Sequence, residues 1–182
     1  KGDSSAMYNY ALMLLKGEGV PVNYEEAIKY YKMAIEKGFS SAMNGYAHML
    51  AKGKGVPVNY EEAIKYYKNA IEKGNSSAMT NYALMLLKGE GVPINYEETI
   101  KYFKMAIEKG NSGAMTNYAC MLENGEGVPI NYEEAIKYYK MAIEKGDLNA
   151  MANYAYMLEK GKGVPINYEE AIEYYKMAIE KG

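Results

Sequence analysis

The chain has 182 residues, a formal net charge of −2 and 21 basic residues, all of them lysine. Binding to nucleic acid needs a basic surface that displaces counterions from phosphates, so this balance argues against a nucleic-acid partner. No run of about 18 apolar residues is present, and the sequence therefore predicts no insertion into a membrane.

A single cysteine excludes a disulfide within the chain and is compatible with a reducing compartment. The chain does not begin with a basic and then apolar signal segment. These two features slightly favour a cytoplasmic location. If the chain is a mature fragment, the secretory lumen or the periplasm is an alternative.

The sequence repeats itself every 36 residues, and the dipeptide Lys-Gly marks the end of each repeat. A fixed period of this length predicts helical or mixed units that stack in a row, each burying its apolar face against its neighbours. We therefore expect one solenoid domain over residues 1–182. Its five repeats run approximately over 3–38, 39–74, 75–110, 111–146 and 147–182.

The first element of each repeat is predicted to be a helix, which we call the A helix. In the first repeat, Ala6, Tyr10 and Leu14 recur at helical spacing, and Gly17 follows as a stop signal. The loop after it carries two glycines and a proline in every repeat, which suits a sharp turn. It lacks the strand and the Gly-Lys-Ser/Thr ending of a phosphate-binding loop.

The second element, which we call the B helix, begins at Asn23. The Asn23 side chain can cap the helix, and Glu26 stands three residues later, as in a capping box. Gly38 ends the helix at a position that favours left-handed backbone. The buried stripe of this helix is expected to contain Tyr24, Ala27, Ile28, Tyr31, Ala34 and Ile35.

These residues carry a resemblance to a known family. The pattern resembles the Sel1-like repeat, a relative of the tetratricopeptide repeat, over the whole chain; it consists of Ala6, Tyr10-Ala11, Leu14, Gly17-x-Gly19-Val20, Asn23, Ala27, Tyr30-Tyr31, Ala34 and Gly38. The resemblance implies an all-α fold, a right-handed α-solenoid of stacked antiparallel helix pairs. It also implies that the A helices line a concave surface used to assemble protein complexes.

The chain departs from this family pattern at several packing positions. Tyr10-Ala11 stands where the family often has Leu-Gly, Leu14 where it has an aromatic residue, and Tyr30 where it has tryptophan. Asn23 replaces an aspartate. These differences bear on the pitch and curvature of the solenoid and leave the helix-pair fold as the expectation.

Positions that vary between the repeats form one arc of the A helix, opposite its constant apolar stripe. The arc either faces water and varies freely, or has diversified to fit an extended ligand. Exposed leucine and tyrosine side chains favour the second interpretation. As a binding surface its candidates are Tyr8, Leu12, Asn44, His48, Thr80, Leu84, Thr116, Cys120 and Tyr156.

A row of asparagines flanks this arc: Asn9, Asn81, Asn117 and Asn153, interrupted by Gly45. Asparagine is a poor residue for the middle of a helix, so each amide is expected to make a specific hydrogen bond. Two partners are open. The amide bonds to the neighbouring repeat, which we favour, or it binds the backbone of a peptide, as in related tetratricopeptide clamps.

Lysines recur near the carboxyl ends of the A helices, at Lys16, Lys52, Lys88 and Lys160. The helix macrodipole already accounts for a cation at this position. As part of a ligand site, the same row would favour an acidic peptide or a C-terminal carboxylate.

The sequence offers no catalytic centre. His48 and Cys120 are the only residues of their types and lie two repeats apart, so a Cys-His pair is not expected. No histidine and cysteine cluster has the spacing of a metal site, and no cofactor is predicted. Cysteine-rich relatives linked to β-lactam hydrolysis have paired cysteines that this chain lacks, which leaves a hydrolase as a minor alternative.

The predicted function is therefore a non-enzymatic scaffold or adaptor that binds an extended peptide or protein segment on the concave A-helix surface. The alternative is a structural or consensus-type array without a ligand. The first and last repeats carry no polar capping helix, so such an array would either belong to a longer chain or associate with itself head to tail through its ends.

Overall fold

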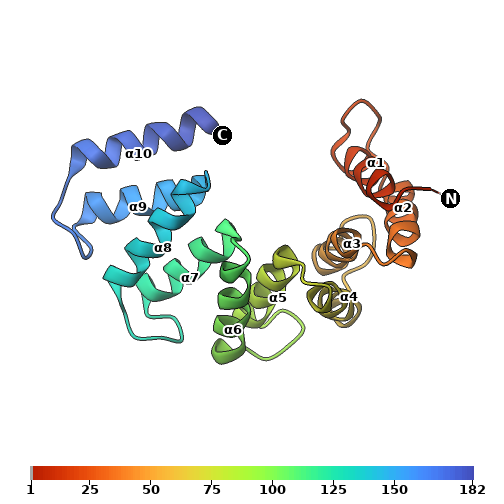
Figure 1. Ribbon diagram of the computed structural model, residues 1–182, viewed down its shortest axis with the longest axis horizontal. Helices are drawn as coiled ribbons and strands as arrows, with labels where there is room; N and C mark the ends of the chain where they lie inside the picture. Colours follow the sequence, from red (N-terminus) through yellow and green to blue (C-terminus); the bar gives the residue numbers. More distant parts are fainter. Residues whose placement is uncertain (1) are drawn as a thin grey trace. The chain divides into compact units, whose positions relative to one another are not determined.

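The computed structural model describes residues 2–182, which form ten helices and no strand (Figure 1). The chain divides into two compact units, Lys1–Ile94 and Asn95–Gly182. Unit 1 contains α1 (Ser4–Lys16), α2 (Tyr24–Glu36), α3 (Ser40–Lys52), α4 (Tyr60–Glu72) and α5 (Ser76–Lys88). Unit 2 contains α6 (Tyr96–Glu108), α7 (Ser112–Asn124), α8 (Tyr132–Glu144), α9 (Leu148–Lys160) and α10 (Tyr168–Lys181).

The odd-numbered helices are the predicted A helices and the even-numbered ones are the B helices. The unit boundary falls in the loop between the A and B helices of the third repeat. The all-α solenoid class of paired helices is confirmed. The single domain over residues 1–182 stays a prediction.

The A helices begin and end where the sequence indicates. The Asp3 carboxylate accepts a hydrogen bond of 2.8 Å from the backbone N–H of Ala6, which satisfies one of the free donors at the start of α1. Gly17 ends the helix with a φ of 74°, a left-handed conformation that glycine adopts without strain. The second repeat differs at one point, because Phe39 precedes α3 and supplies no side-chain cap.

The B helices begin with the predicted capping box. The Asn23 side-chain oxygen accepts from the backbone N–H of Glu26 at 3.0 Å, and the Asn23 amide donates to the Glu26 carboxylate at 3.3 Å. The same pair of bonds recurs at Asn59, Asn131 and Asn167. These hydrogen bonds fix the residue at which each B helix begins after its loop.

The two helices of a repeat pack through small and aromatic side chains. Ala11 on α1 and Ala27 on α2 are fully buried, which lets the helix backbones approach closely. Tyr10 and Tyr30 meet edge to face, with ring centroids 4.8 Å apart. Equivalent pairs join α3 to α4, α7 to α8 and α9 to α10. In Figure 1, the two helices of the last pair run antiparallel along most of their length.

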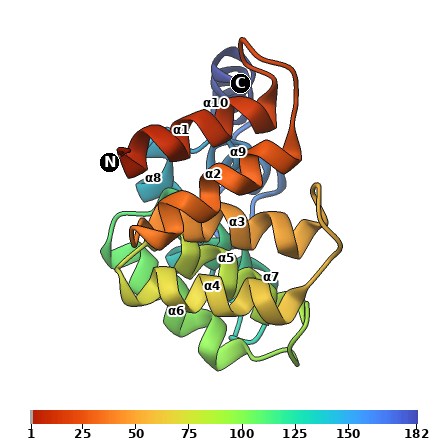
Figure 2. The ribbon, with the colours of Figure 1, turned by 90° about the vertical axis from the view of Figure 1, so that its right-hand side faces the viewer.

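Within unit 1, each B helix packs against the A helix of the following repeat. Figure 2 shows α1 to α4 as successive layers on the side that faces the viewer. The ammonium group of Lys32 on α2 lies 5.4 Å from the ring centroid of Tyr46 on α3, and Lys68 lies 5.5 Å from Tyr82. These cation–π contacts join consecutive repeats.

Unit 2 is stacked by the same contacts. Helix α6 packs against α7, and α8 packs against α9. Lys104 lies over the ring of Tyr118 at 5.6 Å, and Lys140 lies over Tyr154 at 5.2 Å. The interior of unit 2 includes the helix-A methionines Met115, Met121, Met151 and Met157, which are nearly fully buried.

The prediction that Tyr24 belongs to the buried stripe is wrong, since 40% of its surface is exposed. Its side chain lies instead against the backbone of Gly55, in the loop of the next repeat. A Cβ atom added to Gly55 would stand only 2.2 Å from the Tyr24 Cβ. Gly55 also has a φ of 71°. There are therefore two reasons for glycine at the second loop position: the backbone is left-handed there, and the packed tyrosine leaves no room for a side chain.

This Tyr–Gly contact recurs between consecutive repeats: Tyr60 packs on Gly91, Tyr96 on Gly127 and Tyr132 on Gly163. Gly19, in the first loop, has open space at the same position, with the Met13 side chain 3.9 Å away as its nearest neighbour. No helix among residues 2–182 has the length and apolar character needed to cross a membrane.

Candidate functional site

The A-helix face of unit 1 contains a pocket of about 400 Å³. We call it the unit-1 pocket. It brings together six of the residues that the sequence marks as candidates, from α1, α3 and α5, and adds side chains from α2 and from the loops. The lining residues are Tyr8, Leu12, Leu15, Lys16, Tyr24, Tyr31, Asn44, Gly45, His48, Met49, Lys54 and Asn81.

Gly45 explains how the ring of Tyr31 reaches this surface. An added Cβ at Gly45 would lie 2.9 Å from Tyr31 Cζ and 3.0 Å from its hydroxyl oxygen. The tyrosine ring occupies the space that a side chain at Gly45 would need. The break in the asparagine row is therefore a packing feature, which lets the end of the tyrosine ring lie flat against α3.

Tyr31 is a nearly fully buried side chain that lines the pocket. Only 1% of its surface is exposed, and its hydroxyl makes no hydrogen bond with any of residues 2–182. No buried side-chain oxygen of these residues lacks a partner, so the hydroxyl oxygen is open to the pocket. Burial, with a smaller contribution from Tyr8, raises the pKa of the Tyr31 phenol, so the group stays protonated and able to donate.

A second hollow of about 100 Å³ adjoins the unit-1 pocket and shares His48 and Asn81 with it. Lys52 donates to the Glu90 carboxylate on its rim at 3.1 Å. Of the candidate residues, this hollow adds Lys52, Leu84 and Lys88. The two depressions together give unit 1 a continuous A-helix surface with both apolar and basic groups.

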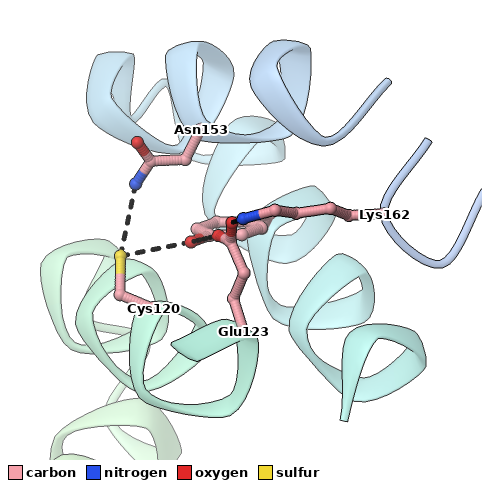
Figure 3. A network of polar contacts seen from close by, with 5 residues as sticks. Cys120, Glu123, Asn153 and Lys162 are labelled. Atoms are coloured by element: carbon pink, nitrogen blue, oxygen red, sulfur yellow. Dashed lines mark hydrogen bonds and ion pairs between the residues drawn. The ribbon is translucent and has the colours of Figure 1, made fainter. Parts of the chain in front are cut away.

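In unit 2, the equivalent surface between the fourth and fifth repeats is filled by a polar network (Figure 3). The Glu123 carboxylate, 8% exposed, accepts from the Tyr139 hydroxyl at 2.9 Å and from the Lys162 ammonium at 2.8 Å. The Asn153 amide lies 3.3 Å from Cys120 Sγ, and the Tyr139 oxygen lies 3.1 Å from the same sulfur. We call these five residues the Glu123 network.

The Glu123 network makes Cys120 a poor nucleophile. Burial raises the pKa of the Cys120 thiol, and the Glu123 and Asp147 carboxylates add to this effect, against an opposing effect of the contacts with Tyr139 and Asn153. A thiol rather than a thiolate is therefore present near neutral pH. The role of Cys120 in this setting is to link two repeats.

Other candidate residues lie outside the two hollows. Thr80 and Thr116 are 7% and 5% exposed, and their hydroxyls donate to backbone oxygens one turn earlier, so they offer a ligand little surface. Asn9 is exposed on α1. Tyr156 is 41% exposed, and the Lys160 ammonium lies 5.7 Å from its ring centroid.

The asparagine row makes different bonds in different repeats. The Asn81 amide donates to Asn44 at 2.9 Å, and Asn153 reaches Cys120, so both bridge to the preceding repeat as we favoured. Asn117 instead donates to the backbone oxygen of Gly113 in its own helix at 2.7 Å. The bond of an asparagine to a bound peptide stays a prediction.

Several residues that shape these surfaces were not among the predicted candidates, including Leu15, Tyr31, Lys54, Glu123, Tyr139 and Lys162. A signal was present in the sequence, because the Leu15 position changes from leucine to alanine or glutamate between repeats. The loop position of Lys54 is also variable, with lysine in two repeats and glutamate in three. Leu15 and Lys54 are 39 positions apart in the sequence and belong to consecutive repeats, so only the structure shows that both line one pocket.

Comparison with known proteins identifies the repeat. A family model described as the Sel1 repeat matches residues 4–39, 40–75, 76–111, 112–147 and 148–182. The chain belongs to the Sel1 repeat family. Sel1 repeat proteins commonly serve as scaffolds for protein interactions. A comparison with curated protein sequences gives no significant match.

Several solved structures share the fold of this chain. A Sel1 repeat protein from Oxalobacter formigenes is 29% identical with a TM-score of 0.87, over 99% of this chain and 74% of its own. A protective antigen of uropathogenic Escherichia coli is 26% identical with a TM-score of 0.80, over 98% of this chain and 38% of the antigen. An immunity protein of Pseudomonas aeruginosa, 20% identical, has a TM-score of 0.74 over 100% of this chain and 66% of its own.

The metal-binding and nucleophilic side chains of the described residues are not clustered. Among residues 2–182, no three His, Cys, Asp or Glu side chains are grouped so as to hold a metal ion. His48 and Cys120 lie in separate units, each with its own set of neighbours.

Proposed function

We propose that this Sel1 repeat chain is a non-enzymatic scaffold that binds an extended peptide or protein segment along its A-helix face. The observation that carries the proposal is the unit-1 pocket, where side chains that differ between the repeats line about 400 Å³ of space. The positions of Tyr8, Leu12 and Leu15 differ between the repeats, and they line the hollow beside constant residues such as Tyr24 and Met49. Variation at lining positions on a constant stacked framework suits a surface adapted to a partner.

The lining of the unit-1 pocket fits a protein segment better than a metabolite. Apolar and aromatic side chains such as Leu12 and Tyr8 lie beside the amides of Asn44 and Asn81. The smaller hollow continues the surface toward Leu84. An extended chain could place successive side chains in the two hollows, with its backbone near the amides.

A peptide-display selection on the intact chain tests the proposal. The control is a variant with Tyr8, Leu12 and His48 changed to alanine, checked for unchanged helicity by circular dichroism. Enrichment of a shared motif on the wild-type chain, lost on the folded variant, is expected. Equal enrichment on both chains, or none on either, would contradict binding at this face.

A second candidate is head-to-tail self-association, favoured by exposed apolar side chains on α10. Tyr168, Ile172 and Ile179 are 63%, 52% and 78% exposed. Equivalents of Tyr168 in earlier repeats pack on a loop glycine of the next repeat, and Gly19 has the matching open space. A second copy could therefore repeat the contact that joins consecutive repeats within each unit.

Light scattering over a wide concentration range tests this second candidate. Association that rises with concentration and is lost in Ile179→Asp is expected, because a charge cannot be buried there without a partner. The matched control is Ile94→Asp, at an exposed loop position. A monomer at every concentration would contradict self-association and leave the A-helix proposal untouched.

A further inference from the structure

The unit-1 pocket and the Glu123 network occupy equivalent places in the repeat, three repeats apart. Tyr31 corresponds to Tyr139, and Lys54 corresponds to Lys162. In unit 2, Tyr139 and Lys162 both donate hydrogen bonds to the carboxylate of Glu123. The residue equivalent to Glu123 in the first repeat is Leu15, so unit 1 keeps the two donors and lacks their acceptor.

The two donors in unit 1 have no substitute acceptor. The Tyr31 side chain is 1% exposed, and its hydroxyl makes no hydrogen bond with any of residues 2–182. Since no buried side-chain oxygen of these residues lacks a partner, the hydroxyl oxygen is accessible from the pocket. Lys54 makes no ion pair within the same range, whereas Lys16, Lys52 and Lys162 each do. A nearly buried phenol without a partner, directed into a pocket, is a group that a ligand can satisfy.

The charged side chains that line the pocket are Lys16 and Lys54, and no carboxylate from residues 2–182 lines it. The imidazole of His48 also lines the pocket, and its lowered pKa favours the neutral form. Glu18 pairs with Lys16 at 3.3 Å on the exposed rim, where both side chains are 60% accessible. Such an exposed pair is weak and leaves the pocket electropositive.

We propose that the unit-1 pocket binds the side-chain carboxylate of an acidic residue in the partner segment, between the Tyr31 hydroxyl and the Lys54 ammonium. The ligand carboxylate takes the place that Glu123 holds in unit 2. A neighbouring apolar side chain of the same segment packs on Leu12 and Tyr8. This inference rests on the proposed function, and names the chemistry that the A-helix face recognises.

The test uses the capped dipeptide acetyl-Leu-Glu-amide as the probe, titrated into the intact chain and followed by ¹⁵N–¹H NMR. We expect shifts at the backbone amides of Gly45 and His48, which line the pocket. Acetyl-Leu-Gln-amide, of the same shape without the charge, should bind about tenfold more weakly, because charge-assisted hydrogen bonds are the stronger ones.

Three variants locate the carboxylate. Tyr31→Phe and Lys54→Gln each remove one donor and should weaken binding of the Glu probe about tenfold. Leu15→Glu supplies an internal carboxylate, as in unit 2, and should abolish the shifts. The matched control is Lys29→Gln on the exposed surface of α2, which should bind as the wild-type chain does. Circular dichroism checks the fold of each variant.

Several outcomes would overturn the inference. These are equal binding of the Glu and Gln probes, no shifts at the solubility limit of the probe, or binding unchanged in both folded donor variants. Equal binding of acetyl-Leu-Leu with a free C-terminus would reject the assignment to a side-chain carboxylate.

The display selection keeps this inference distinct from the proposed function. If the selection enriches peptides without an acidic residue, and their binding is lost on the Tyr8, Leu12 and His48 variant but not on Lys54→Gln, the scaffold function stands and the carboxylate inference fails. If the dipeptide binds as expected and no peptide is enriched, the pocket chemistry stands and the extended-segment proposal fails.

Discussion

The junction of the first two repeats, in unit 1, and that of the last two, in unit 2, share a framework and differ in their interiors. Both have a B-helix tyrosine packed on the loop glycine of the next repeat. At the first junction, leucine and glycine at two A-helix positions leave a pocket. At the last, glutamate and asparagine at these positions complete a network. Stacking and surface chemistry are therefore set by different residues.

The largest loss of stability is expected from changes at the Tyr–Gly contact, which both junctions share. Gly55→Ala and Gly163→Ala should each lower the free energy of unfolding by about 3 kcal/mol, since each combines a positive φ with a clash against a tyrosine Cβ at 2.2 and 2.4 Å. Gly19→Ala has a similar φ and open space, and should cost only about 1 kcal/mol. Urea unfolding by circular dichroism measures all three. Equal costs at Gly19 and Gly55 would show that the packing contributes nothing.

The next largest loss of stability is expected at the position where the two junctions differ, Leu15 in the first and Glu123 in the last. Glu123→Leu removes the acceptor of Tyr139 and Lys162 and should cost about 2 kcal/mol, a value tempered by the partial exposure of Lys162. The reverse change, Leu15→Glu, places a carboxylate near Tyr31 and Lys54 and should cost less than about 1 kcal/mol. Urea midpoints compare the variants. A larger loss for Leu15→Glu would mean that the unit-1 donors do not reach this position.

A smaller effect concerns the reactivity of Cys120. Because burial raises the pKa of its thiol, alkylation by iodoacetamide at pH 7 should be about tenfold slower in the folded chain than in urea. Asn153→Ala opens the site to the reagent and should speed the folded-state reaction, although loss of the amide contact removes an effect that lowers the thiol pKa. Mass spectrometry gives the rates. Equal rates in the folded and unfolded chain would show that the sulfur is not held inside the network.

The smallest effect is expected at His48. Desolvation lowers its pKa below the ordinary value, and Lys54 and then Lys52 lower it further. The other charged groups that line the second hollow with it are Lys88 and Glu90. In Lys54→Gln the pKa should rise by a few tenths of a unit, measured by an NMR titration of the imidazole. No change would mean that the Lys54 ammonium lies away from the pocket.

The sign of the pH effect on stability follows from the same shift. The folded state binds fewer protons at His48 than the unfolded chain does, so its contribution is fully present above the unfolded pKa of about 6.5. The contribution is lost as the pH falls through the lowered pKa of the folded state. His48→Gln should remove this dependence, and a dependence that persists would come from other groups.

Much of the fold could be predicted from the sequence, because the signals are local. Asn23 with Glu26, and Gly17 at the helix end, define their helices through contacts within a few residues. The exposure of Tyr24 could not be predicted in this way, since its contact lies 31 positions later, at Gly55.

The candidate site was predictable only in part. The variable arc led to Leu12 and His48, which do line the unit-1 pocket. Thr80 lies in the same arc and is nevertheless buried, because its hydroxyl is satisfied by its own helix. Lys54 was missed since a charged loop residue is usually solvated, and only the stacked repeats show that it reaches an A-helix surface.

The Tyr–Gly contact has a consequence for how such genes change. Since each tyrosine is received by the following loop, a recombination event that adds or removes a whole repeat regenerates the same contact at the new boundary. Point mutations at the Leu15 and Gly45 positions can then open or fill a hollow without touching that contact. Length and selectivity can thus evolve through separate kinds of mutation.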